Sequence, residues 1–131
     1  MENGIEKQEK ESALKFFGAL GDIKKARYLF TKDCRHHNPY TEPGMDALLE
    51  AIVRVQGDKS MQGNKNATFK VRSVIAEGDM VAVYTTLQSE DKKSGLRQVH
   101  LFRFGSSGKI EEYWDVTQST PANAPYPENM F

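Results

Sequence analysis

The sequence has a single cysteine, Cys34, among its 131 residues, so an internal disulfide is excluded. A catalytic thiolate would need an activating neighbour, and His36 is a poor one because it lies two residues away in a predicted turn. We therefore interpret Cys34 as a small buried filler. The CxxC and HExxH spacings and a Ser-His-Asp order are also missing from the sequence.

An excess of charge is lacking as well, because 18 Lys and Arg residues balance 18 Asp and Glu residues. No net field draws the protein towards other charged molecules, so we expect neither nucleic acid nor a membrane as a partner. The longest apolar runs, such as 51–53 and 81–83, are far too short to cross a bilayer. The charged start MENGIEKQEKE has no apolar signal-peptide core, so we expect a cytoplasmic protein.

Three amphipathic helices are predicted in the first half of the chain. Over residues 6–20 the apolar side chains recur at a spacing of three and four, and Gly21 ends the pattern. Asp22 can cap a second, short helix, and Pro43 suits the first turn of a third. The apolar residues of these two helices are Ile23, Ala26, Leu29 and Phe30, and Met45, Leu48, Leu49, Ile52 and Val53.

Four antiparallel strands are predicted in the second half, where the period changes to two and Val, Ile, Thr and aromatic residues are frequent. Three of the five prolines lie in the tail 119–131, which we expect to be irregular. Helices followed by hairpins indicate an α+β fold in which helices cover one face of a curved sheet. The length suits one domain, 1–131. The predicted strands are 67–76, 80–88, 97–104 and 109–117.

Alternation along the strands groups side chains that could line a hollow in the curved sheet. His100 and Phe102 share one face of the third strand, and Tyr113 and Asp115 share one face of the fourth. Turning this set inward together with Tyr84 would form a pocket with aromatic walls and a titratable pair. The period of two does not decide which face is turned inward.

Four motifs in order along the chain resemble the SnoaL-like branch of the nuclear transport factor two-like superfamily. They are HNPYTEPG, VIAEGDMVAVY, LFRFGSSGKIEEYWDV and the terminal ENMF, and the match runs from about His37 to Phe131. The resemblance implies a cone in which a curled antiparallel sheet, with four main strands and a short one, packs on three N-terminal helices. It also implies a deep apolar pocket and, as in many members, a homodimer formed through the outer face of the sheet.

The resemblance further implies a reaction that needs no metal and no cofactor. The cyclase that gives the family its name is a polyketide cyclase, which performs an intramolecular aldol condensation with a pocket aspartate as acid and base. The family's tryptophan-aspartate pair corresponds to Trp114 and Asp115, which turns Asp115 inward. Tyr113 stands where many relatives have histidine and His100 where they have an acid, so the roles in proton transfer can be redistributed here.

Together these arguments predict an active site for a small apolar or carbonyl-containing ligand. A carboxylate that has lost water in an apolar pocket is a good acceptor for a proton next to a carbonyl group. Histidine and tyrosine side chains would then donate hydrogen bonds to the oxyanion. The predicted catalytic residues are Asp115, His100 and His37, and the predicted substrate-binding residues are Tyr84, Phe102, Tyr113, Trp114, Asn38 and Tyr40.

Other interpretations compete with this one. His37, His100 and Asp115 could form a metal triad, although the adjacent His36 and His37 cannot both face one cavity. His37 and Asn38 could instead only stabilise the turn before the proline, with His36 exposed. For the whole chain, the alternatives to a cyclase, lyase or isomerase are a non-catalytic small-molecule binding protein and a dimerisation or interaction module with a vestigial pocket.

Overall fold

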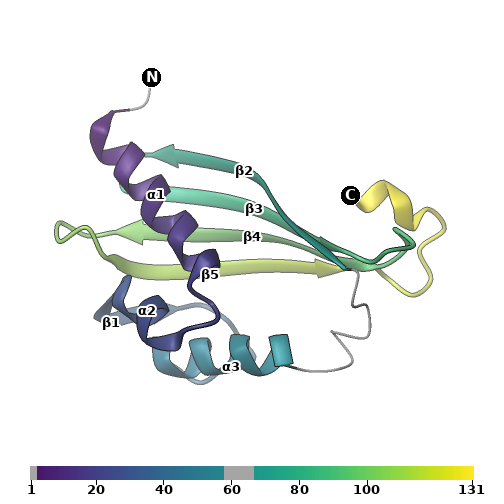
Figure 1. The fold of residues 1–131 in the computed structure, drawn as a ribbon, viewed down its shortest axis with the longest axis horizontal. Coiled ribbons are helices and arrows are strands. Elements are labelled where there is room, and N and C mark those ends of the chain that lie inside the picture. Colours follow the sequence, from purple (N-terminus) through teal and green to yellow (C-terminus); the bar gives the residue numbers. More distant parts are fainter. Residues whose placement is uncertain (1–2, 58–66) are drawn as a thin grey trace.

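A computed structural model of the protein describes residues 3–57 and 67–131 (Figure 1). Helices dominate the first part of the chain and long strands the second, as the sequence predicts. The elements are α1 (Gly4–Gly18), α2 (Ile23–Tyr28), β1 (Phe30–His36), α3 (Met45–Gly57), β2 (Thr68–Glu77), β3 (Met80–Gln88), β4 (Gly95–Phe104), β5 (Ile110–Ser119) and the 3₁₀ turn η1 (Pro127–Met130).

The described strands form one curled, unclosed sheet in the order β1-β5-β4-β3-β2. Neighbours from β5 to β2 are antiparallel, so the four predicted hairpin strands are confirmed. Gly78 and Gly108 turn two of the hairpins with φ values of 61° and 81°, which other residues rarely adopt. The sheet and its helices confirm the predicted α+β class.

The first strand corrects the predicted end of the second helix. α2 ends at Tyr28, and Phe30 begins β1, which pairs with β5 in parallel. The pairing starts where the backbone N–H of Ile110 donates to the carbonyl of Leu29 at 2.9 Å. Leu29 and Phe30 follow the helical spacing locally, but pairing with a distant strand decides their conformation.

The described helices lie on one face and along one edge of the sheet. In Figure 1, α1 crosses this face, while α2 and α3 lie beside β1 at the sheet edge. The ring of Phe16 in α1 contacts Phe30, Phe102 and Tyr113, with centroid distances of 5.6 to 5.8 Å. We call the face that carries Phe102 and Tyr113 the inner face and the opposite one the outer face.

Local capping residues fix where the first two helices begin. The Asn3 side chain accepts from the Glu6 N–H at 2.8 Å, and the Glu6 carboxylate accepts from the Asn3 N–H at 3.1 Å, which forms a capping box. Asp22 caps α2 by accepting from the N–H of Lys24 at 3.1 Å, so the predicted cap is confirmed. Glu6 also accepts from the N–H of Gly78 at 2.9 Å, which ties α1 to the β2–β3 turn.

The tail that follows β5 folds back onto the beginning of β4. The N–H of Thr120 donates to the Gly95 carbonyl at 3.1 Å, and Arg97 donates to the Met130 carbonyl at 3.3 Å. β5 includes Ser119, and η1 is a short regular turn, so the tail is less irregular than predicted.

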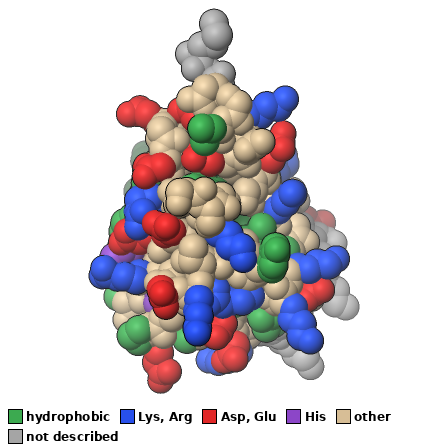
Figure 2. All heavy atoms as spheres, turned by 90° about the vertical axis from the view of Figure 1, so that its left-hand side faces the viewer, with side chains coloured by type: hydrophobic (Ala, Val, Ile, Leu, Met, Phe, Trp, Pro, Cys, Tyr) green, Lys and Arg blue, Asp and Glu red, His purple; other side chains and the backbone are tan. Residues whose placement is uncertain are grey.

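The surface carries charges of both signs. Figure 2 shows acidic and basic side chains interspersed over one end of the molecule, in keeping with their equal numbers in the sequence. Within the two described ranges, no helix is long and apolar enough to span a membrane.

Candidate active site

The register of the sheet places His100 and Asp115 on the inner face. His100 lies opposite Val83 on β3 and opposite Asp115 on β5, and opposing residues share a face of the sheet. The ring of Phe17 from α1 contacts the His100 ring at a centroid distance of 4.9 Å. Tyr113 lies two residues before Asp115 on β5, so their side chains share a face. His100, Tyr113 and Asp115 therefore all point towards the helices.

His100 and Tyr113 form a buried hydrogen-bonded pair. Nδ1 of His100 lies 2.7 Å from the Tyr113 hydroxyl, and Nε2 lies 3.2 Å from Oγ1 of Thr85. Burial lowers the pKa of His100 to about 4, so its imidazole is neutral at pH 7. Burial, followed by the negative charge of Asp115, raises the pKa of Tyr113 well above its usual range. The pair therefore works through hydrogen bonds between neutral groups.

Asp115 is half-buried and held by a residue from the segment between β1 and α3. Nδ2 of Asn38 lies 3.3 Å from both carboxylate oxygens of Asp115. The amide is oriented, because its Oδ1 accepts the backbone N–H of Tyr40 at 2.9 Å. These contacts complete an inner-face network that we define as Thr85, His100, Tyr113, Asp115 and Asn38.

His36 fixes the backbone of Asn38 through a hydrogen bond. The Nε2 of His36 lies 2.6 Å from the Glu42 carbonyl, and its Nδ1 lies 3.1 Å from the backbone N of Asn38. A carbonyl only accepts and a backbone N–H only donates, so Nε2 carries the proton. His36 is thus half-buried within the turn, and the prediction that it is exposed was wrong.

Apolar side chains remain exposed on the same face. Phe69 is 48% exposed and Val71 39% exposed, although both lie on the inner face opposite Leu87 and Thr85. The Phe17 ring lies 5.9 Å from that of Phe69, centroid to centroid. Exposed apolar side chains beside a hydrogen-bonded polar network provide a surface that can desolvate part of a small molecule.

His37 lies on the outer face, away from this network. Its ring stacks on Trp114 with a centroid distance of 4.8 Å, and its Nε2 lies 2.5 Å from Oε2 of Glu112. Arg103 donates to the same carboxylate at 3.1 and 3.2 Å. The hydrogen bond from His37, then that from Arg103, lowers the pKa of Glu112. The predicted grouping of His37 with His100 and Asp115 is therefore wrong.

The predicted substrate-binding residues also divide. Asn38 and Tyr113 belong to the inner-face network, whereas Tyr84 lies opposite Val99 on the outer face and Trp114 stacks on His37 there. Tyr40 is 96% exposed and points away from the fold. Phe102 is fully buried and packs as core. The structure thus does not bring Tyr84, Trp114 or Tyr40 to the network, whereas the buried Phe102 ring packs on Tyr113 at a centroid distance of 5.3 Å.

Thr85 is the network member that sequence reasoning missed. Thr85 and Tyr84 are neighbours on β3, so their side chains point to opposite faces of the sheet. The sequence predicts Tyr84 on the inner face, and only the pairing of β3 with β4 shows that Thr85 lies there instead. His36 was missed as a positioning residue, although its place two residues before Asn38 is a local signal for a turn contact. Among residues 3–57 and 67–131, no three His, Cys, Asp or Glu side chains cluster closely enough to hold a metal ion.

The fold and the site define a class of α+β proteins in which helices cover the inner face of an open, curled sheet that carries polar residues. Residues 15–113 match the sequence profile of the SnoaL-like domain family. The chain belongs to this family, as its motifs predict. No curated protein matches the sequence.

Several solved structures share the fold. A candidate SnoaL-like polyketide cyclase from Jannaschia sp. CCS1 is 20% identical, with a TM-score of 0.69 and 90% of each chain covered. A candidate ketosteroid isomerase from Kribbella flavida is 19% identical, with a TM-score of 0.63 and coverage of 95% of this chain and 88% of that chain. AclR, a candidate hydroxylase from Streptomyces galilaeus, is 21% identical, with a TM-score of 0.64 and coverage of 86% and 90%. Others that share the fold are described as NTF2-like proteins.

Proposed function

We propose that the protein is a small-molecule enzyme in which Asp115 removes a proton from the carbon next to a carbonyl group. The observation that carries this proposal is the position of Asp115 on the inner face, where Asn38 holds both carboxylate oxygens at 3.3 Å. A carboxylate fixed by neighbours needs no reorientation at the moment of proton transfer, which makes it an effective general base.

The other network residues suit supporting roles. Because His100 is neutral and both its nitrogens have hydrogen-bond partners, it orients Tyr113 and does not itself act as the base. The Tyr113 hydroxyl lies next to the charge of Asp115 and helps to position that carboxylate. Asn38 carries a second amide hydrogen on Nδ2, which we assign to the oxyanion that forms when the substrate loses its proton.

The substrate class follows from the surroundings. Phe69 and Val71 are exposed apolar side chains on the face of Asp115, so we propose a small, largely apolar carbonyl compound. Two structural neighbours are described as a candidate polyketide cyclase and a candidate ketosteroid isomerase, and both names fit carbonyl chemistry. A third is described as a candidate hydroxylase, a name that does not point to carbonyl chemistry. The proposed reaction is therefore an aldol-type cyclisation or an isomerisation that uses no cofactor.

The test is proton exchange on a panel of apolar ketones in deuterated water, followed by NMR. We expect the protein to accelerate loss of the proton next to the carbonyl, and Asp115→Asn to abolish the acceleration. Asp33→Asn is the matched control, because Asp33 is an exposed aspartate on β1. Equal exchange rates for the wild type and Asp115→Asn would refute the assignment of the base. Ketone binding without any exchange would favour the alternative of a non-catalytic binding protein.

We also propose that the protein forms a homodimer through the outer face. Tyr84, Val99 and Val116 lie side by side there, and Val116 and Ile75 are 63% and 64% exposed. Covering such a patch removes apolar surface from water. Sedimentation equilibrium should give a dimer for the wild type, a monomer for Val116→Glu and a dimer for Ile5→Glu, which alters an exposed residue of α1. A monomeric wild type at micromolar concentration would refute the proposed dimer.

The expected cytoplasmic location stays a prediction, which cell fractionation can test.

A further inference from the structure

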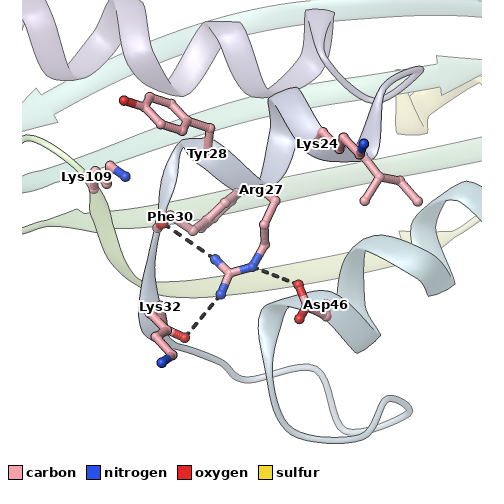
Figure 3. A pocket seen from close by; sticks show the side chains of 8 residues that line it. Lys24, Arg27, Tyr28, Phe30, Lys32, Asp46 and Lys109 are labelled. Carbon is pink, nitrogen blue, oxygen red and sulfur yellow. Dashed lines mark hydrogen bonds and ion pairs between the residues drawn. The ribbon is translucent and has the colours of Figure 1, made fainter.

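A hollow lies at the beginning of β5, away from the carboxylate of Asp115 in the middle of that strand. It has a volume of about 530 Å³ and is formed by α2, the start of β1, the first turn of α3 and the residue before β5. Lys24, Arg27, Tyr28, Lys32, Asp46 and Lys109 contribute to its lining (Figure 3). With a rise of about 3.3 Å per residue, Ile110 and Asp115 lie on the order of 16 Å apart along the strand, so the two sites are separate.

Arg27 forms the fixed floor of this hollow. Its Nε donates to Asp46 at 2.7 Å, and one terminal nitrogen donates to the carbonyl of Lys32 at 3.1 Å (Figure 3). The other terminal nitrogen donates to the carbonyl of Thr31 at 3.0 Å. The carboxylate of Asp46, which lines the hollow, is therefore already paired with this guanidinium. Its negative charge does not compensate the lysines around it.

Three lysine side chains stand around Arg27. Lys24, Lys32 and Lys109 form no ion pair with any Asp or Glu in the described part of the chain. The whole protein has no net charge, so this local excess of positive charge is not a consequence of a generally basic composition. Unpaired ammonium groups around one hollow favour a ligand with more than one negative charge.

The hollow also has an aromatic wall. The ring of Tyr28 is 74% exposed, and the Nζ atom of Lys109 lies 4.1 Å from its centroid. Ile23, another lining residue, is 38% exposed. This ammonium group covers one face of the Tyr28 ring, so a flat ligand ring can stack on the other face while the ammonium binds an attached anion.

We propose that this hollow binds a small organic phosphate that carries a planar ring, the chemistry of a nucleoside diphosphate. Lys24, Lys32 and Lys109 contact the phosphate groups, and Tyr28 stacks on the ring. Lysine is a compact donor of positive charge that suits phosphate, and the volume lies in the range of small-ligand sites. A single hollow of this size, on a chain without net charge, accommodates one nucleotide and does not follow a nucleic acid backbone.

Isothermal titration at low ionic strength with adenosine diphosphate, inorganic pyrophosphate and adenosine tests this site. We expect adenosine diphosphate to bind more tightly than either fragment, because only it engages both lysines and ring. The Lys24→Ala/Lys32→Ala double variant should weaken binding on the order of tenfold. Lys70→Ala, which removes an exposed lysine from β2, should leave binding unchanged. Both altered lysines are exposed, and circular dichroism verifies that the variant is folded.

Tyr28→Ala separates the two parts of the proposal. This substitution should make adenosine diphosphate bind no more tightly than pyrophosphate, and it should leave the affinity for pyrophosphate unchanged. The proposal is overturned if millimolar adenosine diphosphate gives no saturable binding, or if the double lysine variant binds as tightly as the wild type. If pyrophosphate binds the wild type as tightly as adenosine diphosphate, the assignment of the ring to Tyr28 is overturned.

Discussion

The Nδ1 atom of His100 lies 2.7 Å from the hydroxyl oxygen of Tyr113, and both side chains are almost fully buried in the core beneath α1. On its other side the imidazole meets Thr85, another neutral hydroxyl. No carboxylate of the described residues forms an ion pair with the ring. Protonation of His100 would therefore place an uncompensated cation in the core.

This arrangement predicts a loss of stability in acid. The pKa of His100 is about 4 in the folded protein against 6.5 ordinarily, so between these values the unfolded chain binds more protons. The stabilisation is fully present above pH 6.5 and is lost as the pH falls to about 4, with a total on the order of 3 kcal/mol. Urea unfolding at pH 7 and at about pH 4.5 measures it. His100→Gln should lack this part of the pH dependence, and identical pH profiles for both proteins would contradict the burial argument.

The adjacent side chains of His37 and Asn38 point to opposite faces of the sheet, so their substitution by alanine should affect activity differently. Asn38 holds Asp115 on the inner face, whereas His37 stacks on Trp114 on the outer face. With a ketone that the wild type accepts, Asn38→Ala should slow proton exchange on the order of tenfold to a hundredfold. His37→Ala should leave the rate nearly unchanged and serves as the neighbouring control. A larger loss of exchange rate for His37→Ala than for Asn38→Ala would contradict the assignment of the reaction to the inner-face network.

Glu9 in α1 predicts a stabilising substitution. It is 8% exposed, and its Oε2 accepts no hydrogen bond from the described residues. Burial, followed by the charges of Asp79 and Glu6, raises the pKa of Glu9 above 4.5. A raised folded-state pKa means that stability is lost as the pH rises through that value. Glu9→Gln should therefore raise the urea midpoint at pH 7.

The dependence of this effect on pH distinguishes it from a change in helix propensity. Well below pH 4.5, where Glu9 is protonated in both the folded and the unfolded state, the gain from Glu9→Gln should disappear. Glu11→Gln, at an exposed position of the same helix, should have little effect at either pH. A gain of equal size in acid and at neutral pH would rule out the electrostatic cause.

Cys34 should be chemically inert in the folded protein. It is 4% exposed, and burial raises the pKa of its thiol to about 12, so almost no thiolate forms at pH 8. A thiol reagent should modify the protein in urea and leave the native protein unmodified. Because the sequence has one cysteine, mass spectrometry reads this site alone. Rapid labelling of the native protein would contradict the interpretation of Cys34 as a filler.

The local parts of the fold could be predicted because their causes are local. Asp22 caps α2 within three residues, and Gly78 and Gly108 adopt positive φ values in the turns that their neighbours require. Leu29 and Phe30 could not be assigned in this way. Their helical spacing is a property of the segment, whereas their pairing with β5 depends on Ile110, which is distant in the chain.

The amino-acid sequence by itself determined the α+β class, the hairpins and the grouping of His100 and Asp115 with partners two residues away, because side-chain periodicity is a property of each segment. Only the tertiary structure decided which face of each strand meets the helices. It turned Tyr84 and His37 outward and brought Asn38 to Asp115, a residue 77 positions further along the chain. The physical reason is that a period of two leaves two equivalent faces, and contacts between distant segments remove that equivalence.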